Sequence, residues 1–348
     1  MSLGSGFKEN ISRQDLVSNR RNVYNVIYET NYRTWRKSYM DLTKLSAYEI
    51  IEHRDLPDLK SEGALLKHKK SGARVLLISN DDENKVFNIG FRTPTTNSTG
   101  VPHIMEHTVL CGSEKFPTKD PFVELVKGSL NTFLNAMTYP DKTVYPVASC
   151  NEKDFQNLMD VYMDAVLHPN IYKHEEIFLQ EGWNYHLEEA DGELSYNGVV
   201  YNEMKGAFSS PDGVLDRMIL NSLFPDTTYA NESGGDPDVI PELTYAEYLN
   251  FHRTYYHPSN SYIYLYGNMD MEEKLNWLDQ EYLSAYDKKE VDSEIHLQKP
   301  FEKMHDITKP YSIASNESTE DNTYLSYNKV IGTSLDENNS PLSDSVPG

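Results

Sequence analysis

Two histidines and a glutamate stand close together in the segment His103-Ile-Met-Glu-His107. On a helix, residues four apart lie one turn apart on the same face, so both imidazoles can reach a single metal ion. Glu106, three residues after His103, points toward the same side. A carboxylate there can take a proton from water that the metal activates. This H-x-x-E-H pattern reverses the H-E-x-x-H order of zinc proteases and predicts zinc-dependent hydrolysis.

The pattern needs a third ligand, because a catalytic zinc takes three protein ligands and keeps a fourth position open. Glu203 is the best candidate, since it lies in a predicted helix over residues 199–208 whose other residues supply an apolar face. Ordinary interpretations compete with this one. A His/His/Glu group on a helix is often solvated surface or a satisfied part of the core, and a single helix glutamate is usually exposed. The residues alone leave both interpretations open.

The elements around these residues predict an α+β fold, with a mixed or antiparallel sheet and helices packed on one face. Two strands are expected over residues 72–79 and 85–91, joined as a hairpin by the polar turn 80–84. Apolar spacing, caps and stop residues then predict helices near 101–111, 120–128, 152–167, 199–208, 244–255 and 270–286, and strands at 130–136, 183–187 and 262–266.

Composition excludes several classes of function. The 32 basic and 54 acidic residues give a formal charge of −22, which argues against nucleic acid as a partner. No apolar run approaches the roughly 20 residues that span a bilayer, so no membrane partner is expected. Two cysteines, Cys111 and Cys150, cannot form a disulfide framework. We therefore expect a soluble, intracellular protein, in the cytoplasm or in an organelle of mitochondrial or plastid type.

The chain divides into four parts. Residues 1–44 form a basic extension, with eight basic and four acidic residues, which fits either a targeting remnant or a solvated tail. Residues 45–287 form the predicted zinc-protease catalytic domain, and 288–318 a charged, Pro-interrupted linker. Residues 319–348 start a second homologous domain, with a first strand over 322–331. We expect the first domain of a longer, multi-domain protease.

The segment Gly100–Ser113 resembles the zinc helix of the pitrilysin/insulinase superfamily, and within it the branch of the presequence proteases and falcilysin. The likeness covers roughly residues 65–286 and continues in the family's order through 119–122, 128–146, 180–183, 199–206, 233–237 and 255–260. It implies a LuxS/metallohydrolase-like fold.

The resemblance also implies roles for single residues. His103, His107 and Glu203 would bind one Zn²⁺ per chain, and Glu106 would be the base. The 96 residues from His107 to Glu203 match the presequence-protease branch.

Three further residues enter through the same resemblance. Asn135 and Ala136 would lie on an edge strand that accepts the substrate peptide as an added strand. Without the family, Asn135 is equally well a turn or strand-end residue. Glu181 either orients a zinc histidine or faces solvent.

The implied activity is that of a zinc-dependent metalloendopeptidase acting on unfolded oligopeptides. The C-terminal half of the same polypeptide would close over the zinc site and supply an Arg/Tyr pair, so residues 1–348 alone should bind zinc but cleave weakly or not at all. The alternative is a non-catalytic peptide-binding or processing-complex subunit of the same fold. Such a subunit would be expected to lose one of His103, Glu106, His107 or Glu203, and all four are present.

Overall fold

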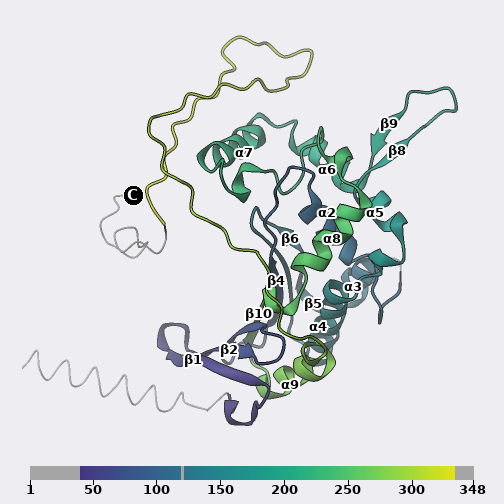
Figure 1. Cartoon of the computed structure of the whole chain (residues 1–348). Coiled ribbons are helices and arrows are strands. Elements are labelled where there is room, and N and C mark those ends of the chain that lie inside the picture. The colour runs from purple at the N-terminus through teal and green to yellow at the C-terminus, as the bar shows by residue number, and fades with distance from the viewer. Residues whose placement is uncertain (1–39, 119–120, 334–348) are drawn as a thin grey trace, which may run out of the picture.

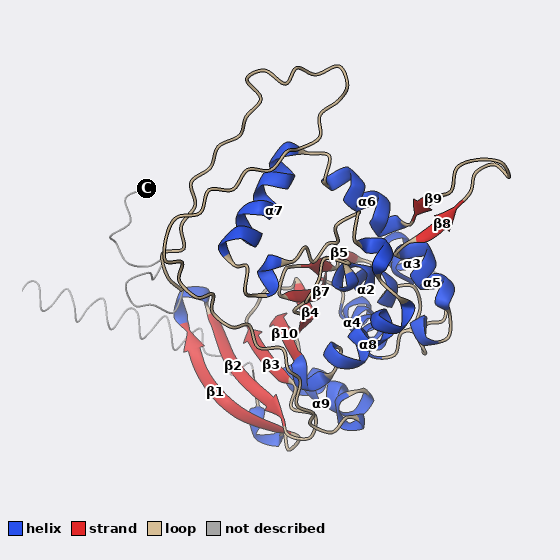
Figure 2. Cartoon of the chain, turned by 45° about the horizontal axis from the view of Figure 1, so that its top comes forward, coloured by secondary structure: helices blue, strands red, loops and turns tan. Residues whose placement is uncertain are grey.

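The computed structural model describes residues 40–118 and 121–333. Its central layer is an eight-stranded sheet in the order β1-β2-β3-β10-β4-β7-β5, with the short β6 also paired to β7 (Figures 1 and 2). The strands are β1 Tyr48–Leu56, β2 Ser61–His68, β3 Arg74–Ser79, β4 Lys85–Arg92, β5 Asn131–Leu134, β6 Met137–Thr138, β7 Lys142–Ser149 and β10 Ser261–Gly267.

Helices pack against one face of this sheet. Figure 2 shows α2, α4 and α8 together on that side, and α4 contacts both β4 and β7. The helices are α2 Val101–Val109, α3 Pro121–Gly128, α4 Glu152–Leu167, α5 Glu175–Glu181, α6 Val199–Ala207, α7 Pro211–Leu223, α8 Tyr245–Tyr255 and α9 Met271–Glu281. The predicted α+β class, with a mixed sheet and helices on one face, is therefore confirmed.

The hairpin predicted over residues 72–91 is wrong. Both strands form, but β10 lies between them, parallel to β3 and antiparallel to β4. The polar turn instead closes over the end of β10, where the Asn268 amide donates to the carbonyl of Asp82 (2.7 Å). A turn signal between two strands cannot reveal that a strand nearly two hundred residues later enters between them, because local sequence carries no information on non-local pairing.

The predicted start of a new strand over residues 322–331 is also not formed. That segment is extended loop within the part of the chain that the structure describes. A strand needs a neighbour to take its main-chain hydrogen bonds, and no strand pairs with these residues here. The predicted helix 270–286 ends at Glu281 and continues as a short 3-10 turn, Leu283–Ala285. Most of the basic extension and the last fifteen residues lie outside the described residues.

The helix that carries the two histidines begins in a crowded place. Its N-cap, Gly100, has φ +70°, and a Cβ there would lie 2.7 Å from Cα of Gly235. Only glycine combines this left-handed backbone with so close an approach. From there α2 buries Ile104, Met105 and Val109 against the core. Its start and its rotation are thus fixed by backbone contact and by packing.

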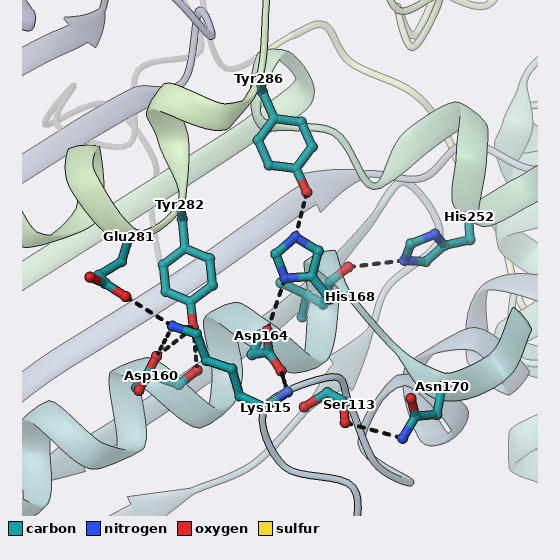
Figure 3. Close-up of polar contacts among 11 residues, drawn as sticks. Ser113, Lys115, Asp160, Asp164, His168, Asn170, His252, Glu281, Tyr282 and Tyr286 are labelled. Carbon is teal, nitrogen blue, oxygen red and sulfur yellow. Dashed lines mark hydrogen bonds and ion pairs between the residues drawn. The ribbon is translucent and has the colours of Figure 1, made fainter. Parts of the chain in front are cut away.

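A network of polar contacts holds the loop after α2 against α4 and the end of α9 (Figure 3). The Lys115 ammonium contacts Asp160 and Glu281, each at 3.1 Å, and the Lys115 amide donates to buried Asp164 (2.7 Å). Asp164 also contacts Nδ1 of His168 (2.9 Å). Helix α2 is therefore anchored at its C-terminal end as well.

Within the described residues, no helix combines the length and the apolar character needed to cross a membrane. The longest of those named above, α4, has 16 residues with acids in its first turn.

The buried His252 of α8 should make the stability of this fold depend on pH. Burial lowers its pKa to about 4, although the Val166 carbonyl, 2.9 Å from Nε2, acts in the opposite direction (Figure 3). The unfolded chain, with a pKa of about 6.5, binds the proton more readily, so stability is full above that value and falls as the pH decreases toward 4. At pH 5 the expected loss is about 2 kcal/mol. Urea unfolding at pH 7 and pH 5 should show this loss, and His252→Gln should lose that much less between the two; equal losses in both proteins would contradict it.

Candidate metal centre

Three side chains from two helices converge at one end of the sheet. Nε2 of His103 and Nε2 of His107 each lie 3.8 Å from Oε2 of Glu203. The three ligand atoms are all within 4.8 Å of one another. Among the described residues, this is the group of histidine, cysteine or acidic side chains whose geometry can hold a metal ion. The two histidines of α2 and the predicted third partner, Glu203, are thus close together in the structure.

Each histidine is oriented by a second partner on the far side of its ring. Nδ1 of His103 lies 3.0 Å from the carbonyl of Gly234, which can only accept, so this nitrogen carries the proton. Nδ1 of His107 lies 3.3 Å from Oε2 of Glu181. Both rings consequently turn Nε2 toward Glu203, as metal-binding histidines do when a carbonyl or carboxylate holds the other nitrogen.

The carboxylates around His107 change its proton affinity. Burial of the ring acts to lower the pKa of His107, but the hydrogen bond to Glu181 and the charges of Glu106, Glu181 and Glu203 outweigh it and raise the pKa. A histidine binds a metal only in its neutral form. Proton and metal therefore compete here, and affinity for a metal should fall as the pH becomes acidic.

Glu106 lies beside the three-residue group without belonging to it. Its side chain is nearly buried, and Oε2 accepts a hydrogen bond of 2.8 Å from the hydroxyl of Thr138 in β6. Glu106, His103 and Glu203 line one cavity of about 510 Å³. The carboxylate is thus held at the cavity wall, within the space where a substrate and water would meet the metal.

The group has the right chemistry for zinc. Two imidazole nitrogens and one carboxylate oxygen form a common catalytic zinc set. Metal–ligand bonds of about 2.0–2.1 Å in a tetrahedral site bring ligand atoms to about 3.3 Å from one another. The 3.8 Å from Glu203 to each ring nitrogen exceeds this by about half an ångström, and the Glu203 side chain, 54% exposed, is free to move closer. The three ligand atoms lie within 4.8 Å of one another, so a small rotation of the two rings would complete the approach. These residues fit a zinc ion.

Asn135 and Ala136 lie between β5 and β6, at the outer edge of the sheet. The Asn135 amide donates inward to the carbonyl of Pro146 in β7 (3.2 Å), so the edge pairing runs through this residue. The Ala136 amide donates to Oδ1 of Asn135 (3.0 Å). The predicted edge position is present, and one outward-facing donor is covered only by a partly exposed side chain.

The long stretch between α5 and α6 leaves the sheet as a two-stranded ribbon, β8 Asn184–His186 and β9 Ser195–Asn197, which projects from the body in Figure 1. The chain leaves at Gly182 and returns at Gly198, where a Cβ would lie 2.2 Å from the carbonyl oxygen of Gly182. This contact brings the end of α5 next to the start of α6. Glu181 and Glu203 thus both reach His107 despite the residues between them.

Two partners in the site escaped the sequence reasoning. Thr138 gave no signal, since a threonine in a strand usually reflects β-propensity alone. Gly234 lies in the segment 233–237, whose likeness to the family was noted without a role. Its paired glycines were a usable signal for a close backbone approach. Neither contact follows from spacing along the chain.

Comparison with known families places this geometry in context. The family described as "Insulinase (Peptidase family M16)" matches residues 85–229, and "Peptidase M16 inactive domain" matches 242–344. A solved structure titled "Crystal Structure of pitrilysin" superposes with a TM-score of 0.57 at 18% identity, covering 73% of this chain and 26% of that one. This superposition supports the fold. The chain belongs to the pitrilysin/insulinase superfamily of peptidases.

Curated relatives narrow the assignment. "Presequence protease 1, chloroplastic/mitochondrial" of Arabidopsis thaliana is 54% identical over 69% of this chain and 22% of its own length. "Presequence protease, mitochondrial" of Mus musculus is 39% identical over 85% and 30%. "Protein HypA" of Clostridium perfringens is 60% identical over 84% and 30%. Within the superfamily, the chain belongs to the presequence-protease branch.

The chain spans less than a third of the length of these relatives. The prediction that the chain is part of a longer protease is confirmed by this, and its first position there stays a prediction. The domain boundaries stay predictions. The cellular compartment also stays a prediction, since the relatives include a bacterial protein as well as mitochondrial and chloroplastic ones.

The site should bind one zinc ion per chain. Metal analysis after zinc loading should give about one equivalent for the wild type. Replacing His103 or Glu203 by alanine removes one of three ligands and should weaken zinc binding by more than the roughly 10–100-fold that losing a hydrogen-bond partner of a ligand costs. Glu242→Gln, an exposed acid on another element, is the control and should bind as the wild type does. Equal zinc affinity in all these proteins would contradict the assignment.

Proposed function

We propose that this chain is the catalytic N-terminal part of a zinc metalloendopeptidase that hydrolyses unfolded oligopeptides. The observation that carries the proposal is the convergence of His103, His107 and Glu203, with Glu106 at the same cavity wall. Membership of the presequence-protease branch supports the substrate class, which includes presequences, transit peptides and other short peptides.

Residues of this chain would bind and orient the reacting groups. His103, His107 and Glu203 would hold the zinc, which when bound would supply the Lewis acidity that makes water a stronger acid and a peptide carbonyl more reactive. Glu106 takes the proton from the attacking water and later gives it to the leaving amine. Thr138 donates to one carboxylate oxygen of Glu106, which leaves the other oxygen for that transfer.

The edge of the sheet would hold the peptide. An extended peptide can pair with the open edge at residues 134–136, and main-chain hydrogen bonds then bind almost any sequence. Thr138 follows only two residues after Ala136, so a peptide on this edge runs past Glu106. The proposed binding strand and the proposed base are thus linked through β6.

One side of the site is open, which supports a role for the rest of the polypeptide. The Glu203 side chain is 54% exposed, against 12% for His103. Peptide hydrolysis profits when water is excluded and a second surface holds the substrate. We therefore assign closure of the site to the C-terminal half of the same polypeptide.

Glu106→Gln should separate binding from chemistry in the full-length protein. The amide keeps the shape of the side chain but cannot accept a proton, so zinc content should stay at the wild-type value while turnover of an unfolded peptide falls by at least about 100-fold. Glu242→Gln should have wild-type turnover. Wild-type protein that binds zinc without any turnover would favour the alternative, a non-catalytic peptide-binding or processing subunit. Retained turnover in Glu106→Gln would move the base elsewhere.

Ala136→Pro should weaken substrate binding without removing the metal. Proline has no amide proton, so one main-chain hydrogen bond to the peptide is lost. A bond of about 1 kcal/mol corresponds to a rise in KM of roughly five- to tenfold. Ala136→Gly keeps the donor and should have a KM near that of the wild type. If both variants raise KM equally while zinc content is unchanged, the donor at this position has no role in binding.

A further inference from the structure

The segment 231–236 is attached along the chain that leads into α2. The Glu232 amide donates to the Ser98 hydroxyl (3.1 Å), and the Asp236 amide donates to the Ser98 carbonyl (2.8 Å). Gly235 packs directly against Gly100, the N-cap of α2. The segment and the start of the histidine helix therefore form one unit, and a movement of the segment would also move the start of α2.

Within this unit, Glu232 restrains both peptide groups that meet at Gly234. Oε1 of Glu232 accepts a hydrogen bond from the Gly234 amide (3.0 Å). The carbonyl of the same residue faces Nδ1 of His103 at 3.0 Å. The Gly235 amide, in the same peptide group as that carbonyl, donates to the main-chain carbonyl of Glu232 (3.1 Å). Glycine has no side chain to restrict its backbone, so the two hydrogen bonds that Glu232 accepts hold the direction of Gly234.

A partly buried ion pair in turn holds Glu232. Nε of Arg217, on α7, lies 2.7 Å from Oε2 of Glu232, and the two side chains are only 25% and 16% exposed. The Arg217 guanidinium also donates to the Gly213 carbonyl (2.9 Å) and lies 4.7 Å from the ring centre of Phe208. Such a multiply held arginine has little freedom, and a charged partner this buried is costly to leave alone.

We propose that Glu232 is a positioning residue for His103. It acts through Gly234 to keep the Nδ1–H tautomer and the ring orientation that turn Nε2 toward Glu203, and Arg217 holds it in place. Both residues also line the cavity of about 510 Å³ beside the site, so α7 forms part of the cavity wall and, through Glu232, contacts the segment that touches His103. The inference rests on the proposed zinc site and adds the contacts that orient one of its ligands, His103.

The test compares two ways of removing a negative charge near the zinc. Glu232→Gln and Asp216→Asn each remove one charge from the same cavity, but Asp216 is an exposed residue of α7 that lies beside Arg217 in the chain. Glu232→Ala removes the acceptor for Gly234 as well. Zinc affinity is measured by competition with a chelator, and the protonation of His103 by ¹⁵N NMR of the imidazole in the metal-free protein.

We expect zinc affinity to fall by about 10–100-fold in Glu232→Ala, with loss of the fixed tautomer at His103. Glu232→Gln and Arg217→Met should each fall by less, and Asp216→Asn least. The double variant Arg217→Met/Glu232→Ala should be no weaker than Glu232→Ala, because Arg217 acts through Glu232.

Two outcomes are kept apart by this design. Wild-type affinity and a wild-type His103 signal in Glu232→Ala, or a loss of affinity in Asp216→Asn as large as that in Glu232→Ala, would overturn the positioning role. Failure of the wild type to bind zinc would instead reject the proposed function. If Glu232→Ala does not fold, as judged by thermal unfolding, Glu232→Gln and Arg217→Met carry the same comparison.

Discussion

The convergence of His103, His107 and Glu203 is the constraint on which the site depends, because a metal bond of about 2 Å would tolerate little error in side chains from two separate helices. His103 and His107 satisfy it together, since one helical turn separates them. Glu203 must arrive on a different helix, and its carboxylate lies 3.8 Å from both rings. The sheet, the anchors at both ends of α2 and the contact between Gly182 and Gly198 all serve to bring these two helices to the same place.

The sequence predicts best what is local. The helix over residues 152–167, the capping box of Thr244 and Glu247, and the paired histidines all follow from spacing within a few turns. Glu203 was chosen as third ligand from its helix and from a family resemblance. The strand order of the sheet could not be predicted, because β10 lies between β3 and β4 but comes from a distant part of the chain. Thr138, Gly234 and Glu232 were missed for the same reason, since contacts through carbonyls and single hydroxyls leave no periodic pattern.

Two sets of contacts orient the side chains of the site, one at the histidines and one at Glu106. The histidines are prepared from outside by Gly234 and Glu181, which fix the ring nitrogens before any ion arrives. The Glu106 carboxylate is held from the other side by Thr138, on the strand that follows the open edge. Preparation of this kind lowers the reorganisation needed at each step. It also means that residues with no direct part in the chemistry determine how well the ligands work.

The two ends of the ribbon are in contact at Gly182 and Gly198. The length of the ribbon therefore does not affect the positions of Glu181 and Glu203. Residues could be added or removed beyond that contact, and the carboxylates on either side of it would keep their positions. The tip of β8–β9 is for this reason the natural place to graft a fluorescent reporter or an affinity tag, far enough from the helices to report on them without disturbing them.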